Sequence, residues 1–224
     1  MKIINRPKGT CDIYPPRSLL YQNLYQIISE VLVRNNFKPV IIPTYEYSEL
    51  FNASLGSTTD IIHKEMFNFV DRKGRSLALR PEGTASVARL VLQNQLFTTG
   101  YPLKLYYWAN MFRYERPQKD RYREFWQLGV ELIGAKGIMA DYQILKVIQD
   151  VFESLGIKGF ICNLNYLGSR ATQERYKEKL KLFLAETNPD LCSDCQHRVN
   201  LNSLRTLDCQ LCPKKFSFPP YRIA

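Results

Sequence analysis

The sequence has no apolar run long enough to cross a membrane, and no signal peptide at its N-terminus. A transmembrane helix needs about 20 consecutive apolar residues, and a secretory signal has an apolar segment behind a basic start. Here residues 1–4 are followed directly by Asn5-Arg6-Pro7-Lys8. An internal repeat is also lacking, which excludes repeat architectures. We therefore expect a cytoplasmic protein with no membrane partner.

Acidic residues are outnumbered by basic ones. The 224 residues include 31 Lys and Arg against 21 Asp and Glu, so the formal charge is +10 and the pI is about 9.3. This excess favours a polyanionic partner, a nucleic acid or a nucleotide, and indicates nothing about the fold. The hydrophobic content of 45% is that of a globular protein that can bury a full core.

Histidine is scarce, so a metal site would depend on cysteine. Neither His63 nor His197 is expected to be a ligand, although His197 could substitute for one cysteine. In a reducing cytosol the six cysteines are expected to be thiols or metal ligands rather than disulfides. Cys11 and Cys162 are interpreted as small apolar residues.

The other four cysteines form two pairs near the end of the chain. Cys192-x-x-Cys195 and Cys209-x-x-Cys212 are separated by thirteen residues. Two such pairs are typical of a zinc knuckle, although this spacing is slightly shorter than the usual one. The alternative is a set of buried or incidental thiols, and the sequence leaves both interpretations open.

Helices mixed with antiparallel strands, rather than a strict strand–helix alternation, indicate an α+β fold. Apolar periodicity predicts helices over residues 19–35, 81–95, 139–155 and 169–185, and a helical turn over 46–52. It predicts strands over residues 39–43, 66–70, 76–79, 103–111, 128–133 and 160–164. Ser18 is expected to cap the first helix, which buries Leu20 in its apolar stripe. Residues 71–74 are expected to form a hairpin turn with Gly74 at positive φ.

The segment 112–127 carries the strongest chemical signal. It holds four arginines among aromatic side chains, between two apolar runs. Guanidinium groups bind phosphate oxygens in pairs, and aromatic rings stack on purines, so the segment suits a nucleotide triphosphate. The alternative is a solvated, charged hairpin loop.

Two further motifs lie on either side of that segment. Arg80-Pro81-Glu82-Gly83-Thr84 ends a strand and opens a helix, where Glu82 and Thr84 suit an ammonium group. A helix N-terminus that favours an acid explains the same residues without a ligand. Gln127, Gly129 and Glu131 alternate, so they share one face of a strand. We expect Gly129 to leave room for a ligand there, although a solvated face has the same pattern.

Together these motifs resemble the histidyl-tRNA synthetases, a family of class II aminoacyl-tRNA synthetases. The matching segments follow the family's order: Lys8-Gly9-Thr10 with Asp12, the Pro43 strand with Glu46, Thr59-Asp60-Ile61 with Lys64-Glu65-Met66, residues 80–84, residues 112–118 and residues 127–134. The resemblance covers about residues 5–210. It implies a truncated class II fold, an antiparallel β-sheet flanked by helices, and a homodimer interface built by residues 19–43.

The resemblance also implies roles for individual residues. Glu82 and Thr84 match ligands of the histidine α-amino group, and Gln127 and Glu131 match residues that hold the substrate, with Glu131 on the imidazole. The nucleotide-binding matches are Arg113 on the α-phosphate and the amino-acid carboxylate, Arg121 on the γ-phosphate, and Glu115 and Phe125 on adenine, with the Phe125 ring stacking. Arg113 is the implied catalytic residue, because it would stabilise charge at phosphorus. Mg²⁺ would bridge the ATP phosphates.

The sequence also departs from the family's pattern. The second histidine-specific segment, the third class II motif and the anticodon-binding domain would lie beyond Ala224, so a half-built substrate site is expected. Asp120 stands where a glycine is usual, and Trp126 where a smaller or polar residue is usual. We expect a partial catalytic core over 1–188 and a cysteine-containing tail over 189–224.

Three functions therefore remain open. The first is a histidine–tRNA ligase core fragment, in which the complete enzyme activates histidine with ATP and transfers it to tRNA(His). The second is a non-catalytic synthetase-like paralogue, acting as a regulatory or tRNA-binding subunit. Such paralogues usually lose the charged loop and residues 80–84, and this chain keeps both. The third is an RNA-binding module, whose binding would depend on salt and not on ATP.

Overall fold

The computed structural model describes residues 3–55, 65–115, 121–164, 168–187, 191–207, 209 and 212. The matched motif residues 59–61 and 64, His63, and the loop residues 116–120 lie outside this part of the chain. The chain divides into two compact units, Met1–Phe160 and Ile161–Ala224. The predicted boundary between residues 188 and 189 falls within the second unit, and that division stays a prediction.

The arginine-rich segment joins two long strands at the centre of the first unit. β5 (Leu103–Phe112) and β6 (Glu124–Ile133) are antiparallel, in a register that pairs Tyr107 with Gly129. β1 (Lys38–Pro39) runs parallel to β5, which completes a sheet in the order β1-β5-β6. A smaller antiparallel sheet has the order β2-β4-β3. Its strands are β2 (Tyr45–Tyr47), β3 (Asn68–Val70) and β4 (Ser76–Leu79).

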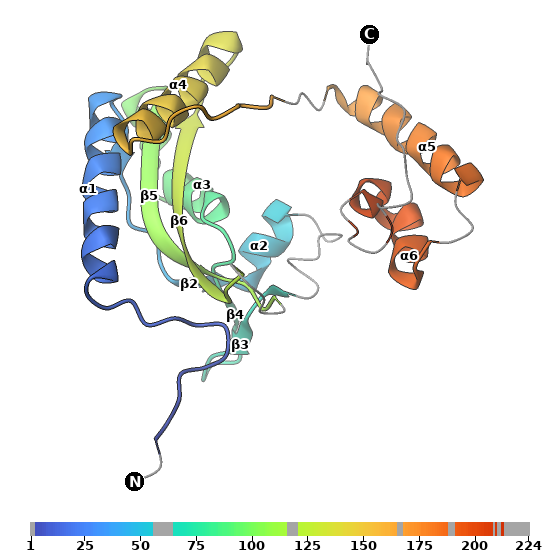
Figure 1. Cartoon of the computed structure of the whole chain (residues 1–224), viewed down its shortest axis with the longest axis horizontal. Coiled ribbons are helices and arrows are strands. Elements are labelled where there is room, and N and C mark those ends of the chain that lie inside the picture. The colour runs from blue at the N-terminus through green and yellow to red at the C-terminus, as the bar shows by residue number, and fades with distance from the viewer. Residues whose placement is uncertain are drawn as a thin grey trace. The chain divides into compact units, whose positions relative to one another are not determined.

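Helices cover both faces of the larger sheet (Figure 1). The helices of the first unit are α1 (Arg17–Arg34), α2 (Ser48–Leu55), α3 (Thr84–Gln93), the short 3-10 helix η2 (Leu96–Thr99) and α4 (Ile138–Ser154). Tyr106 on β5 packs against α1 and α4, in a core that includes Leu32 and Val147. The neighbouring Tyr107 faces the other way and packs with Val87 of α3. Alternate strand residues thus serve two cores, and the predicted α+β architecture is confirmed.

The second unit is helical in the part that the structure describes. It contains α5 (Arg170–Thr187), α6 (Ser193–Asn202) and the 3-10 helix η3 (Ser203–Thr206), drawn in orange to red in Figure 1. The basic helix predicted over residues 169–185 is confirmed as α5. The sequence analysis did not predict α6.

Several local predictions were wrong. Residues 39–43 form no continuous buried strand: β1 ends at Pro39 and Ile41 is 95% exposed. The chain leaves the sheet there because the carbonyl groups of Ile42 and Pro43 turn to accept hydrogen bonds from the Arg80 guanidinium. Residues 160–164 form no strand, because this segment lies where the two units meet in sequence and Ile161 is exposed.

Two helix starts also differ from the prediction. α1 begins at Arg17 with Pro16 as its N-cap, so Ser18 lies inside the helix, and Leu20 is 55% exposed. The expected helical turn over residues 46–52 begins later, because Glu46 pairs with Ala78 in the smaller sheet and α2 starts at Ser48. The hairpin turn is confirmed, with Gly74 at φ +78°.

Candidate active site

The residues predicted to bind histidine gather where the N-terminus of α3 meets the face of β6. The Thr84 hydroxyl donates to Glu131 Oε1 at 2.8 Å. The Gln127 amide donates to the Tyr107 hydroxyl at 3.4 Å. Because Gln127 and Glu131 lie two residues on either side of Gly129, one strand face presents both toward the same place, as the alternation predicts.

The space above Gly129 is occupied by a tyrosine, which corrects the prediction that this glycine leaves room for a ligand. A Cβ atom at Gly129 would lie 2.0 Å from Cζ of Tyr107. A Cβ atom at Gly83 would lie 2.2 Å from the same atom. The ring therefore lies between two glycines, with 2% of the residue exposed. Sequence analysis missed Tyr107, although the β5–β6 register places it directly opposite Gly129.

Burial and negative charge shape the protonation of this cluster. Burial, followed by the charges of Glu131 and Glu82, raises the pKa of Tyr107 to about 12. The phenol therefore stays protonated at neutral pH. Burial also raises the pKa of Glu131, and the charge of Glu82 acts in the same direction. A cationic or hydrogen-bond-donating ligand would offset both costs, so the cluster suits an ammonium or imidazole group.

We expect Gly129→Ala to displace the Tyr107 ring and to lower the free energy of unfolding of the first unit by about 1–3 kcal/mol, because the added methyl group overpacks a closed space. Chemical denaturation measures the loss. Tyr107→Ala empties that space, so the two substitutions should couple by about 1–3 kcal/mol in a double-mutant cycle. Additive effects would show that the ring and the glycine do not compete.

Glu82 does two things at the start of α3. Its carboxylate accepts hydrogen bonds from the backbone amides of Thr84, at 2.6 Å, and Ala85, at 3.0 Å. These bonds satisfy amides that otherwise lack a partner, and they explain why the helix begins at Thr84 rather than at Pro81. Glu82 thus lies at the helix N-terminus, where the helix dipole favours an acid, and the same bonds hold its carboxylate beside Thr84.

Arg80 is buried directly before this segment. Its guanidinium donates to the carbonyl oxygens of Ile42, Pro43 and Asn110 at 2.6, 2.9 and 2.8 Å, and to the Asn110 side chain at 2.9 Å. Burial lowers its pKa. The contacts join the chain before β2 to β5, so Arg80 positions the residues that follow it.

The residues predicted to bind the nucleotide lie at the loop end of the β5–β6 hairpin. Arg113 Nε donates to the carbonyl oxygen of Pro81 at 2.9 Å, and its guanidinium lies 5.1 Å from the centroid of the Phe125 ring. Phe125 also packs against the α3-side core. Since Pro81 directly precedes Glu82, the arginine and the acidic cluster are neighbours.

Arg121 and Glu115 form an ion pair of 3.3 Å. The Arg121 side chain is 62% exposed, so this pair is weak and open to exchange with a stronger anion. Burial, followed by the charge of Glu115, raises the pKa of the nearby Glu65 carboxyl. Arginines and carboxylates thus share one partly open site.

The N-terminal motif Lys8-Gly9-Thr10 contacts the start of the strand β6 in the β5–β6 hairpin. The Gly9 carbonyl accepts from the Arg123 amide at 2.7 Å, and a Cβ atom at Gly9 would lie 2.7 Å from Cγ of Arg123. Gly9 also has a φ of +90°. Both this backbone conformation and the close Arg123 side chain favour glycine at this position. The Arg123 guanidinium lies 3.9 Å from the centroid of the Tyr114 ring.

The four paired cysteines converge in the second unit. The sulfur atoms of Cys192, Cys195, Cys209 and Cys212 all lie within 4.8 Å of one another. The structure describes all six cysteines of the chain, and none of them forms a disulfide.

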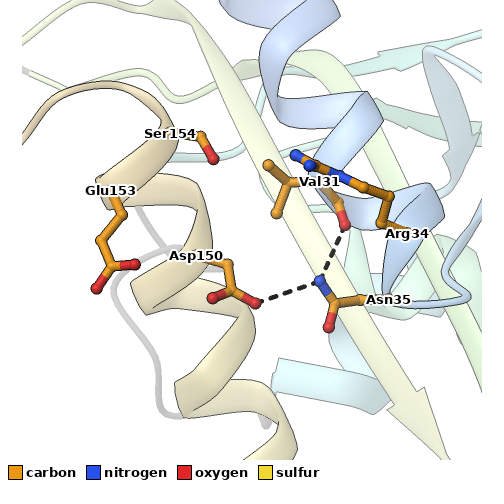
Figure 2. A pocket seen from close by; sticks show the side chains of 6 residues that line it. All are labelled: Val31, Arg34, Asn35, Asp150, Glu153 and Ser154. Carbon is orange, nitrogen blue, oxygen red and sulfur yellow. Dashed lines mark hydrogen bonds between the residues drawn. The ribbon is translucent and has the colours of Figure 1, made fainter.

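A pocket of about 450 Å³ lies between α1 and α4. Figure 2 shows the Asn35 amide there, donating to the Val31 carbonyl at 3.0 Å and to the Asp150 carboxylate at 3.4 Å. The bond to Asp150 ties α1 to α4, whereas the bond to Val31 lies within the end of α1. None of the predicted site residues lines this pocket. Among the described residues, no helix is both long enough and apolar enough to cross a membrane.

Comparison with known proteins identifies the family. A family model described as histidyl-tRNA synthetase matches residues 9–168. The histidine–tRNA ligase of Aquifex aeolicus (strain VF5) is 44% identical over 208 residues, which cover 93% of this chain and 52% of that protein. The histidine–tRNA ligase of Desulfitobacterium hafniense (strain DSM 10664 / DCB-2) is 42% identical over 207 residues, which cover 92% of this chain and 49% of that protein. The chain thus spans about half the length of these curated relatives.

Solved structures agree with these matches. The structure of an apo S. aureus histidyl-tRNA synthetase superposes with a TM-score of 0.70 at 31% identity, over 96% of this chain and 51% of that one. A Bacillus halodurans protein described as an ATP phosphoribosyltransferase regulatory subunit/histidyl-tRNA synthetase has a TM-score of 0.66 at 25% identity. The match covers 93% of this chain and 59% of that one. By fold, by motif and by sequence, the chain belongs to the histidyl-tRNA synthetase family.

Proposed function

We propose that this chain supplies the ATP- and histidine-binding half of a histidine–tRNA ligase, which activates histidine and transfers it to tRNA(His). One observation carries the proposal: Arg113 contacts Pro81, the residue before Glu82. An anion-binding group therefore lies beside an acidic cluster that suits a cation. An amino acid whose carboxylate attacks a phosphate needs these two environments side by side.

The acidic cluster divides the recognition of histidine. Glu82 and Thr84 would bind the α-amino group, and Glu131 and Gln127 would hold the imidazole side. The Tyr107 ring lies between Gly83 and Gly129 and closes the floor where a ligand would otherwise reach the backbone at Gly129. Discrimination would come from the polar side chains, because a site built from polar partners rejects ligands that leave those partners unpaired.

The hairpin would bind ATP. Arg113 would hold the α-phosphate and, as the catalytic residue, stabilise the charge that develops at phosphorus. Arg121 would leave Glu115 for the γ-phosphate, and Glu115 with the Phe125 ring would then contact adenine. Glu65, whose carboxyl group lies near Arg113 and Arg121, would offer an oxygen donor of the kind that Mg²⁺ takes together with phosphate groups. Bound Mg²⁺ would neutralise phosphate charge.

Residues near α1 support a homodimer. Leu19, Leu20, Val33 and Ile41 are exposed apolar residues within the family's interface region, with Ile41 95% exposed. Burial of such exposed apolar side chains would favour association, and equilibrium sedimentation would reveal it. Cytoplasmic localisation follows from the same proposal, because charged tRNA is used at the ribosome.

Pyrophosphate exchange tests the proposed function. The chain should return label from pyrophosphate to ATP only when histidine is present, if this half of the site suffices for activation. Calorimetry with ATP and with histidine tests binding separately. The resemblance to the Bacillus halodurans protein favours a regulatory paralogue as the second candidate. Binding of neither ligand would support that candidate, and salt-dependent binding of any tRNA without ATP would indicate an RNA-binding module.

We expect Glu131→Gln to weaken histidine binding by about 10- to 100-fold, because hydrogen bonds to a charged group contribute about 1.5–3 kcal/mol. The substitution keeps the shape of the side chain and its contact with Thr84. Calorimetry measures the affinity, and Glu49→Gln, on the exposed surface of α2, is the matched control. Equal affinities in the two variants would remove Glu131 from the histidine site.

A further inference from the structure

Four cysteines from two separate segments meet inside the second unit. Cys192 is the N-cap of α6, and Cys195 lies in its first turn. Cys209 follows η3, and its amide donates to the Thr206 carbonyl at 3.3 Å, which turns the chain back. Cys195, Cys209 and Cys212 are buried and Cys192 is half-buried.

The separation of the sulfur atoms suits one metal ion. A tetrahedral site with Zn–S bonds of about 2.3 Å places its sulfur atoms about 3.8 Å apart. Cys192 Sγ and Cys209 Sγ are 3.8 Å apart, and the four sulfur atoms span at most 4.8 Å. A disulfide needs about 2.05 Å. An iron–sulfur cluster distributes its four cysteines over two or four iron atoms, so the four cysteine sulfurs do not all lie within the range of one ion.

Backbone donor groups lie beside the sulfur atoms. The Cys192 amide donates to Cys212 Sγ at 3.4 Å, which links the two cysteine pairs. The N-terminus of α6 carries a partial positive charge, and Cys192 and Cys195 lie there. The backbone and the proximity of the sulfur atoms thus bring the two cysteine pairs together.

These cysteines also form a hydrophobic core of the second unit. Cys195, Cys209 and Cys212 make one buried cluster, with Leu191 and Cys192 packed against it. A unit of this size rarely holds together on apolar burial alone, and natural small units commonly add a metal. A metal at the cluster would fix the start of α6 to the segment after η3.

We propose that Cys192, Cys195, Cys209 and Cys212 bind one Zn²⁺ in a closed tetrahedral site that stabilises the fold of residues 161–224. Four thiolates leave no open coordination position for water, so the ion is structural. Binding replaces the thiol protons, which pass to solvent, and no electron is transferred. The site lies outside the residues proposed for ATP and histidine, so it stands independently of the proposed function.

Elemental analysis of the full chain, purified under reducing conditions without chelator, is the first test. We expect about one zinc per chain. Cys209→Ser should lose most of it, whereas Cys162→Ser, an exposed cysteine of the same unit, should keep it. A metal-free unaltered chain with intact helices would overturn the proposal, as would equal zinc loss in both variants.

Two measurements on the unaltered chain guard against a variant that fails to fold. A thiol reagent should modify Cys11 and Cys162 rapidly and the other four only after a chelator is added. Co²⁺ exchanged into the site should give the visible absorption of a tetrahedral thiolate complex. Six equally reactive thiols, or Co²⁺ absorption typical of octahedral oxygen ligands, would contradict the assignment.

Discussion

Arg113→Ala is expected to lower the rate of ATP–pyrophosphate exchange by about 10²- to 10³-fold, the usual cost of removing one preorganised group that stabilises transition-state charge. Arg113 is held for this role by the Pro81 carbonyl and the Phe125 ring. Its affinity for ATP should fall by a smaller factor, about 10-fold or more, because the ground state also uses the guanidinium. Exchange assays and calorimetry measure the two effects.

Two variants make the Arg113 test specific. Arg72→Ala removes an exposed arginine from the hairpin turn of the smaller sheet, so it changes net charge equally and should leave both values unchanged. Arg113→Lys keeps the charge without the planar pair of donors and should recover only part of the loss. An Arg113→Ala chain with normal ATP affinity and exchange would refute the role of this residue.

Arg80→Met is expected to lower the free energy of unfolding of the first unit by about 3–5 kcal/mol. The substitution leaves the buried carbonyl groups of Ile42, Pro43 and Asn110 without their shared donor, and each unsatisfied acceptor costs about 1–3 kcal/mol. Part of that cost is offset, because the buried charge no longer has to be desolvated. Urea denaturation measures the difference.

The controls for Arg80 separate charge from geometry. Arg72→Met removes an exposed arginine and should change stability by less than about 0.5 kcal/mol. Arg80→Lys keeps a cation but cannot reach all four acceptors, so its loss should be intermediate. If Arg80→Met were as stable as Arg72→Met, the contacts around Arg80 would contribute nothing net to stability.

The long elements of the fold were predictable because their signal is local. The apolar runs on either side of the arginine-rich segment predicted β5 and β6, and the period of 3.6 residues predicted α4 and α5. The prediction of a strand over residues 39–43 was wrong because the carbonyl groups of Ile42 and Pro43 bond to Arg80, almost forty positions downstream. No sequence pattern near Ile42 predicts that its carbonyl group accepts a hydrogen bond from the Arg80 side chain.

In the candidate site, too, local motifs predicted some residues, whereas other contacts depend on the fold. Motifs placed Glu82, Thr84, Gln127 and Glu131 in the candidate site, and the contact between Thr84 and Glu131 confirms that two of them meet. Tyr107 was missed because its role depends on the strand register, which sets it opposite Gly129. The contacts of Arg113 with Phe125, and of Arg121 with Glu115, likewise depend on how the hairpin folds.

By itself the sequence determined the family, through motifs kept in order, and the two cysteine pairs, through their spacing. Only the tertiary structure decided that Tyr107 fills the floor above Gly129, that Arg80 is a buried positioning residue, and that four sulfur atoms lie close enough for one ion. The physical reason is range: periodicity and spacing act between neighbours in the chain. Packing, burial and convergence depend on strand register and on segments that are distant in sequence.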